Sequence, residues 1–491
     1  MATLAGRDGS PFRVIDIVAL TTLAAFLRGR LLLSTIDTPG DGPAKAWLAL
    51  NWANAPHVVL HGIWPPGFLY LTGLVSYVLP IWIGLRLFNA LVGTATVPVF
   101  FTTVGRVFGP PTGLIAAAFI AVFPLHVELS ASSLTEASAI LEVALGVAFL
   151  TMAAQPGARR PAMLNGLAIG CLVLASMTRY EAWFLLPLFP GYYWLRTGHW
   201  RRALGMAALL FAFPVAWTIG NHVYEGNALL GLRSATHDPS FGHVGVPFTS
   251  AAKMLVMHFA THLGWVVVVF FALGLVMECR SLVAGRLSPE RILYLAIVLV
   301  LLAGSGVFAM IRGATVTNRY LLFGFAFSLP MAALPISAGL QRMKRHGLWL
   351  VIVLLAMYTA GSSLWTGRME TAWVTRAKPE SIIRFEEWVN KTPWRAGAMI
   401  FTRMDWQPTY LAYYFPAFAG RAIIISEWLD DTVLQRWTQA VQPALLVTQR
   451  GDEAYVQRFV RVTGIAVAPE RLVYRNGDVR IYELPTPLSP G

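Results

Sequence analysis

The chain has 491 residues, of which 56% are hydrophobic and only 13% are charged, and its formal net charge is +13 at pH 7. Soluble globular proteins carry about 25% charged residues, so the composition excludes an ordinary soluble enzyme and indicates a polytopic membrane protein. Basic residues gathered in short loops between apolar segments follow the positive-inside rule, and we expect no nucleic-acid binding.

Apolar segments long enough to cross the bilayer recur along roughly the first three quarters of the chain and predict about eleven transmembrane helices. With basic loops placed in the cytoplasm, the first expected span leads outward and the last delivers the C-terminus to the outside. The expected spans are residues 14–36, 84–107, 112–125 and 134–154, a hairpin over 164–195, a span near 203–222, spans ending near Arg280, Arg312 and Arg342, and 348–365.

The long first external loop contains the sequence Trp64-Pro65-Pro66-Gly67, which precedes an apolar stretch at 68–80. This stretch has the length of an interfacial or re-entrant helix and is too short for a full span. Counting it as a span would invert the orientation of every later helix.

From about residue 366 the composition becomes that of a soluble domain, and β-rich runs alternate with helical patterns. We therefore expect a transmembrane domain over 1–365 and an extracytoplasmic α/β domain over 366–491. The expected strands are 398–402, 422–426 and 444–448, the expected helices are 409–415, 431–441 and 453–463, and a final hairpin over 471–484 turns at Asn476-Gly477.

Two carboxylates, Asp37 and Asp41, stand just after the first expected span, and His61 and Trp64 follow in the same loop. A carboxylate there can accept a proton from an attacking hydroxyl. Either aspartate can instead cap the helix expected to begin near Pro43. The local sequence leaves both interpretations open.

The second external loop carries Glu128 and leads to Glu136, which opens the fourth span. The helix dipole alone favours an acid in that first turn. Two acidic loops on one face could also hold a divalent cation, but their spacing matches no metal-binding signature, and we assign no metal ligands.

Two arginines, Arg179 and Arg319, fall at the external ends of spans. Their planar guanidinium groups suit a lipid phosphate at that depth. The alternatives are that Arg179 pairs with Glu181 or snorkels to the interface, and snorkelling is the expectation for Arg28 and Arg30 in the first span.

Several features in this order resemble the GT-C membrane glycosyltransferases, and in particular glycosyltransferase family 39, which includes protein O-mannosyltransferases and lipid A aminoarabinose transferases. They are the arginines of the first span, the Asp-containing loop, the Pro-Pro turn with its interfacial helix, Leu134-Thr135-Glu136, Thr178-Arg179-Tyr180-Glu181-Ala182-Trp183 and Asn318-Arg319-Tyr320-Leu321-Leu322. The likeness covers about residues 14–340, and the order and topology of the motifs carry it.

The resemblance implies a multi-pass protein of the plasma membrane, and the basic loops predict a cytoplasmic N-terminus. It implies transfer of a sugar from a polyprenyl-phosphate donor to a glycan, lipid or protein acceptor on the extracytoplasmic face, with inversion at the anomeric carbon. No cofactor is certain. Membrane lipids are the other expected partner.

By the same resemblance, Asp41 matches the first-loop acid and would be the general base, with Asp37 as the fallback. Glu136 matches the acid of the second loop and would position donor or acceptor. Arg179 and Arg319 match the positions that hold the donor phosphate. Two further residues, His61 and Trp64, would line the cavity.

The chain departs from the family pattern at two places. Gly42 follows Asp41 where relatives often have a second acid, and Trp64 precedes the Pro-Pro turn where many have Lys or His. The donor sugar and the acceptor therefore do not carry over. The alternative function is a transporter or flippase of a lipid-linked sugar, which would show paired repeats or broken helices. A catalytically silent scaffold is a third possibility.

Overall fold

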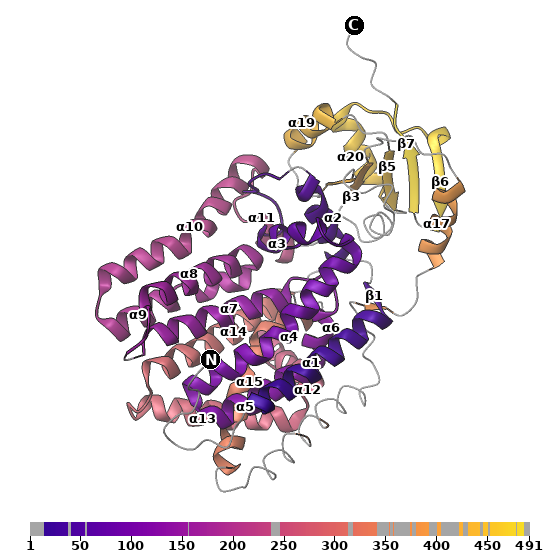
Figure 1. Ribbon diagram of the computed structural model, residues 1–491. Helices are drawn as coiled ribbons and strands as arrows, with labels where there is room; N and C mark the ends of the chain where they lie inside the picture. The colour runs from indigo at the N-terminus through magenta and orange to yellow at the C-terminus, as the bar shows by residue number, and fades with distance from the viewer. Residues whose placement is uncertain are drawn as a thin grey trace.

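The computed structural model places most of the helical part of the chain and pieces of the C-terminal part. It describes residues 14–37, 41–54, 56–155, 157–236, 246–312, 318–340, 353, 357, 374–375, 380–391, 400–403, 422–425, 431–441, 445–449, 452–477 and 479–485. A bundle of long helices forms the larger body, and a smaller α/β unit stands at one end of it, next to helix α2 (Figure 1).

Eight helices among the described residues are long and apolar enough to cross a membrane, which confirms the prediction of a polytopic helical protein. They are α1 (Val14–Ser34), α4 (Ile81–Phe108), α7 (Glu136–Ala153), α8 (Pro161–Thr178), α10 (Trp200–Glu225), α13 (Trp265–Val283), α14 (Pro289–Arg312) and α15 (Asn318–Leu340). A ninth is counted if α5 (Pro110–Val122) and α6 (Pro124–Ser130), which meet at 59°, form one span. The span expected at 348–365 falls almost wholly outside the described residues, so the number eleven stays a prediction.

Shorter helices connect the spans. They are α2 (Asp41–Asn54), α3 (Gly67–Ser76), η1 (Tyr180–Leu185), α9 (Leu188–Thr197), α11 (Leu230–Thr236) and α12 (Phe248–Leu263). At 10 residues, α3 is too short to cross a bilayer, as expected for the stretch after the Pro-Pro turn. The hairpin expected over 164–195 is the span α8 followed by η1 and the 10-residue α9.

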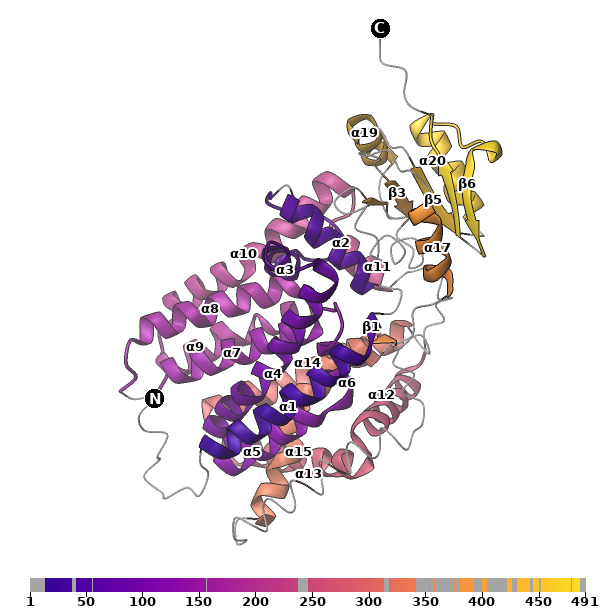
Figure 2. The same ribbon diagram turned by 45° about the vertical axis from the view of Figure 1, so that its right-hand side comes forward.

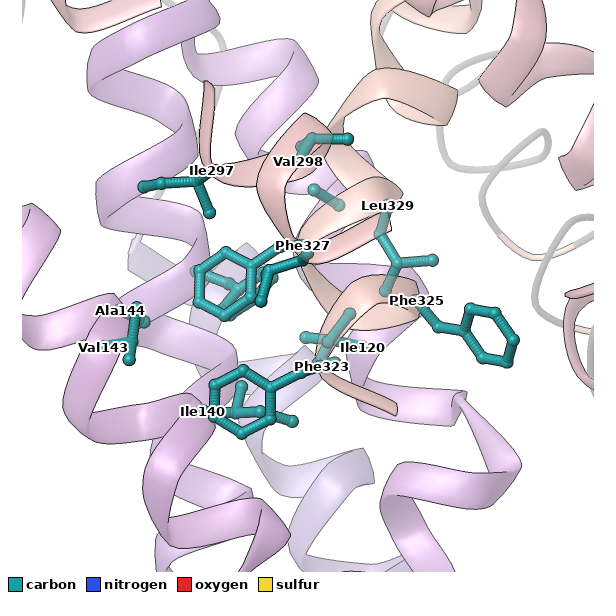
Figure 3. Packing of buried hydrophobic residues seen from close by; sticks show 14 of the residues in the cluster. Ile120, Ile140, Val143, Ala144, Ile297, Val298, Phe323, Phe325, Phe327 and Leu329 are labelled. Carbon is teal, nitrogen blue, oxygen red and sulfur yellow. The ribbon is translucent and has the colours of Figure 1, made fainter. Parts of the chain in front are cut away.

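Helix α15 is the centre of the bundle. In the apolar stretch of α15, 89% of the residues are buried. In that of α13 only 17% are buried, so most of α13 faces outward. Phe323 and Phe327 of α15 lie beside Ile140 of α7, Ile120 of α5 and Ile297 of α14 in one continuous apolar core (Figure 3). The core therefore fixes the start of α15 relative to the start of α7.

The break between α5 and α6 is held by a buried arginine. Pro124 has no N–H to offer the carbonyl of Ile120, and the guanidinium of Arg28 on α1 donates instead to the carbonyls of Ala121 (3.2 Å) and Ile120 (3.4 Å). It also donates to Nδ1 of His126 (2.6 Å). Arg28 is fully buried, so the expectation that it snorkels to the interface is wrong.

The α/β unit contains a five-stranded sheet of order β4-β3-β5-β7-β6, in which β3, β4 and β5 are parallel and β5, β7 and β6 antiparallel. Its elements are α17 (Glu380–Lys391), β3 (Ile400–Arg403), β4 (Ala422–Ile425), α19 (Asp431–Val441), β5 (Leu445–Gln449), α20 (Glu453–Thr463), η5 (Pro469–Arg471), β6 (Leu472–Asn476) and β7 (Val479–Glu483). The three predicted strands, two of the helices and the final hairpin are confirmed. The helix expected at 409–415 lies outside the described residues, and α17 was not expected.

The two faces of this sheet pack against different partners, because side chains alternate along a strand. Leu446 faces α19 and α20, in a cluster with Phe459. Its neighbours Leu445 and Val447 belong to an apolar cluster that includes Trp47 of α2. Figure 2 shows the unit beside α2 from a second direction. A second link is the antiparallel pairing of β1 (Ile36–Asp37) with β2 (Val374–Thr375).

The hydrogen bonds from Arg28 to the break between α5 and α6 predict that replacing Arg28 lowers the stability of the protein more than replacing Arg30, on the same helix. Arg28→Met leaves two buried carbonyls without their donor, at about 1–3 kcal/mol for each, so we expect a clearly lower unfolding temperature. Arg30→Met changes an exposed side chain on the same helix and is the matched control, with little expected effect. Thermal unfolding of both variants in detergent micelles measures this, and equal temperatures would contradict the capping role.

Candidate functional site

Charged side chains from four separate helix ends meet at the end of the bundle next to α2. They come from the start of α2, the start of α7, the residues after α8 and the start of α15. We call Asp41, Lys45, Glu136, Arg179, Glu181 and Arg319 the charged cluster. It holds three carboxylate side chains and three cationic side chains.

The first pair in this cluster joins α2 to α15. Arg319 donates a hydrogen bond to Oδ2 of Asp41, the first residue of α2, and both side chains are largely buried. Burial alone would raise the pKa of Asp41, but the charges of Arg319 and Lys45 outweigh it and hold that pKa below its ordinary value. Asp41 is therefore a carboxylate at neutral pH, and its partner makes it a weak base.

The second group of contacts in the cluster is centred on Arg179, which directly follows α8. Its guanidinium donates to Oε1 of Glu136 (2.5 Å), to the hydroxyl of Thr135 (3.1 Å) and to both oxygens of Glu181 (2.5 and 3.0 Å). Burial would lower the pKa of Arg179, but Glu136 and Glu181 raise it above its ordinary value. The pairing with Glu181 suggested by the sequence is thus present, and Glu136 is added to it.

An aromatic ring brings the two arginines together. The guanidinium carbons of Arg179 and Arg319 lie 5.8 Å and 4.9 Å from the ring centroid of Tyr320. Arg319 also donates to the Tyr320 hydroxyl at 3.1 Å. A ring face attracts cations, so Tyr320 offsets part of the repulsion between two like charges placed close together.

Lys45 is the member of the cluster that sequence reasoning missed. It lies one turn after Asp41 on α2, is 7% exposed, and its ammonium sits 5.1 Å from the ring centroid of Trp64. It makes no ion pair with any acid of the described ranges. Burial lowers the pKa of Lys45 to about 8 although Asp41 and Glu136 oppose that shift. The i, i+4 spacing from Asp41 was the signal available in the sequence.

The cluster also holds an unused acceptor. Oε2 of Glu136 is buried and finds no hydrogen-bond partner among the residues that the structure describes. Such groups are rare because each costs about 1–3 kcal/mol. A free acceptor in Glu136 and an ion-pair-free cation in Lys45 fit a ligand that brings both an anionic oxygen and a hydrogen-bond donor.

The structure places the remaining predicted residues around the cluster. Trp64 contacts Lys45. His61 has its Nδ1 2.7 Å from Oε1 of Glu225 at the end of α10, and its ring is stacked on Tyr224. Asp37 is buried and accepts hydrogen bonds from Ser133, ahead of α7.

The described part of the chain contains no group of three or more His, Cys, Asp or Glu side chains arranged to hold a metal ion. Asp41 and Glu136 are each bonded to an arginine. A divalent cation at these acids would have to compete with the guanidinium groups.

No family model matches the sequence. No curated protein is significantly similar to it in sequence. The fold, in contrast, is shared with solved membrane glycosyltransferases. ArnT from Cupriavidus metallidurans bound to undecaprenyl phosphate aligns with a TM-score of 0.58 at 14% identity, covering 96% of this chain and 97% of that one.

The oligosaccharyltransferase of Archaeoglobus fulgidus tethered to an acceptor peptide aligns with a TM-score of 0.58 at 12% identity, covering 94% of this chain and 74% of that one. The oligosaccharyltransferase AglB from Archaeoglobus fulgidus, in complex with an inhibitory peptide and a dolichol-phosphate, aligns with a TM-score of 0.53 at 13% identity, covering 90% of this chain and 71% of that one. The chain has the GT-C fold, as its resemblance to that group predicted.

The pKa of Lys45 predicts how anion binding depends on pH. Because that pKa is about 8, the ammonium loses its proton as the pH rises above 8, and affinity for geranyl phosphate should fall in that range. Phosphate itself stays dianionic there, with its second pKa near 6. Lys45→Gln should bind about tenfold more weakly and without this alkaline decline, as measured by titration calorimetry in detergent between pH 7 and 9.5. The same alkaline decline in the variant would remove Lys45 as its source.

Proposed function

We propose that this protein is an integral membrane glycosyltransferase that moves a sugar from a polyprenyl-phosphate donor to an acceptor on the extracytoplasmic face, with inversion. The observation that carries the proposal is the charged cluster. Three buried cations and the carboxylate of Asp41 stand together at one end of a GT-C bundle. Phosphate binding and proton removal need these two kinds of group side by side.

The donor phosphate is the ligand for the cations. Solved proteins of the same fold contain undecaprenyl phosphate and dolichol-phosphate. Arg179 and Arg319 offer guanidinium groups that suit phosphate oxygens, and Lys45 adds a cation that forms no ion pair within the described part of the chain. Together they stabilise the negative charge that collects on the phosphate as the sugar leaves.

Asp41 is the base in this proposal, and donor binding prepares it. While Arg319 is bonded to Asp41, the pKa of the carboxylate is lowered. A donor phosphate competes for Arg319, which weakens that bond and raises the pKa of Asp41 toward its ordinary value. Asp41 then takes the proton of the acceptor hydroxyl. At the same time the hydroxyl oxygen of the acceptor forms a bond to the anomeric carbon, and the bond between that carbon and the donor phosphate oxygen breaks. A single displacement inverts the configuration.

The other predicted residues take supporting roles. Oε2 of Glu136 is placed to accept a hydrogen bond from a sugar hydroxyl. The ring of Trp64 stabilises the ammonium of Lys45, which lies 5.1 Å from the ring centroid. Asp37, the fallback base, is bonded to Ser133, so we assign it a structural part. His61 stays a prediction as a cavity residue, with Glu225 as its contact.

Membrane orientation and domain division belong to the same proposal. The N-terminus is cytoplasmic, the plasma membrane is the location, and residues 366–491 form the extracytoplasmic domain beside the site. One structure of the archaeal oligosaccharyltransferase contains zinc and sulfate. Activity before and after chelation by EDTA tests whether a divalent cation takes part here.

The first test is transfer of radiolabelled sugar from polyprenyl-phosphate donors in membranes that carry wild-type protein or Asp41→Asn. Loss of the base predicts a fall of 10²–10⁴-fold in kcat with donor binding retained. Glu278→Gln is the matched control, since it makes the same change in an acid that pairs with Arg291 between α13 and α14. Equal transfer by Asp41→Asn would remove it as the base. Absence of wild-type transfer across a broad donor panel, with movement of the lipid-linked sugar across vesicles, would favour the transporter alternative.

A second prediction concerns the pair of Arg319 and Asp41. Arg319→Gln removes the positive charge that lowers the pKa of Asp41, so that pKa rises. Activity requires the deprotonated carboxylate, and the acid limb of kcat/KM should therefore move to higher pH, while donor affinity falls about tenfold or more. The pH–rate profile of the residual activity measures the shift. An acid limb at the wild-type position would show that Asp41 does not control it.

A further inference from the structure

Behind the charged cluster lies a set of buried polar side chains that the proposed reaction does not use. Asp37, Arg86 and Asn89 are between 0% and 4% exposed. All three bond to the short segment 131–134, which joins α6 to α7. That segment lacks the hydrogen bonds of a regular helix, so these side chains supply them.

Asp37 holds the middle of the segment. Its Oδ1 accepts from the backbone N–H of Ser133 at 3.0 Å, and its Oδ2 accepts from the Ser133 hydroxyl at 2.6 Å. Two charge-assisted hydrogen bonds to one residue fix both its position and its rotation.

Helix α4 holds the two flanks. Arg86 and Asn89, three residues apart on one face of α4, reach the segment together. Nε of Arg86 donates to the carbonyl of Ala131 (2.7 Å), and Nδ2 of Asn89 donates to those of Ser132 (2.7 Å) and Leu134 (2.5 Å). The Arg86 Nε also lies 3.9 Å from the Asp37 carboxylate.

The held segment touches both halves of the charged cluster. Its next residues, Thr135 and Glu136, bond directly to Arg179. On the other side it meets Gly42, the neighbour of Asp41, where an added Cβ would lie 3.5 Å from Cβ of Ser133. Segment 131–134 is thus the spacer between Asp41 and the Arg179–Glu136 pair.

We propose that Asp37, Arg86 and Asn89 form a positioning clamp that sets the placement of Glu136 and Arg179 relative to Asp41. The clamp rests on the proposed function for its catalytic meaning. Asp37 acts through Ser133 and does not contact substrate. Displacing catalytic groups by about 1 Å can cost about 10²-fold in rate, so the clamp determines kcat more than it determines stability.

The experiment compares Asp37→Asn, Ser133→Ala and the double variant with wild type. The matched control is Ser337→Ala, which removes another buried hydroxyl pair, with Thr112 at 2.7 Å, near the far end of α15. Four properties are measured for each: hydrogen exchange of the peptide spanning 131–136, affinity for geranyl phosphate, sugar transfer and unfolding temperature.

We expect faster exchange in the peptide and a 10–100-fold lower kcat for each single clamp variant, with the double variant no worse than the poorer single one. Ser337→Ala should lower the unfolding temperature about as much as the clamp variants do. It should leave hydrogen exchange of the peptide spanning 131–136, affinity for geranyl phosphate and kcat unchanged.

Three outcomes overturn the clamp. They are unchanged exchange in Asp37→Asn, rate losses that multiply in the double variant, or loss of all transfer in Asp37→Asn with none in Ser133→Ala, which would make Asp37 the base. If wild type binds geranyl phosphate but transfers no sugar, the proposed function fails. The clamp is then judged by exchange and by non-additive losses of phosphate affinity.

Discussion

A guanidinium removed from water needs partners for its N–H groups, and four buried arginines find several of theirs by joining segments far apart in the chain. Arg28 joins α1 to the α5–α6 break, and Arg86 joins α4 to the ends of α1 and α6. Arg179 joins α8 to α7, and Arg319 joins α15 to α2. Between lipid-embedded helices the hydrophobic effect gives little preference for one arrangement, so such polar links decide the geometry.

The same demand prepares the site electrostatically. Each arginine of the charged cluster is already bonded to an acid, and the three carboxylates of the cluster balance its three cations, so the cluster as a whole is neutral without a ligand. In the proposed reaction, an incoming phosphate would exchange with these acids, and each exchange would free a carboxylate. Binding the leaving group and releasing the base would then be one event at the Arg319–Asp41 pair. Lys45 makes no ion pair with the acids that the structure describes, so it provides a cation that would need no such exchange.

Hydropathy located the eight long apolar helices, and the chemistry of the loop ends together with the family resemblance selected Asp41, Glu136, Arg179 and Arg319 as candidates. The sequence did not reveal which acid pairs with which arginine, because partners such as Arg319 and Asp41 stand 278 residues apart in the chain. The misreading of Arg28 has the same origin. A one-dimensional pattern shows an arginine in an apolar helix, but it does not show the freed carbonyls of another helix that make full burial possible.

Helix α2 is where the two parts of the molecule meet. Each residue of an α-helix turns about 100° around the axis, so Asp41 and Lys45 lie on one side of α2, while Ala46 and Trp47 lie on other sides. The first side carries the contacts to Arg319 and Trp64, and the second belongs to the apolar cluster shared with Leu445 of the α/β unit. The helix is thus fixed by charge on one side and by apolar packing on the other. A shift of the α/β unit would move α2, and with it the carboxylate and the ammonium that face the site.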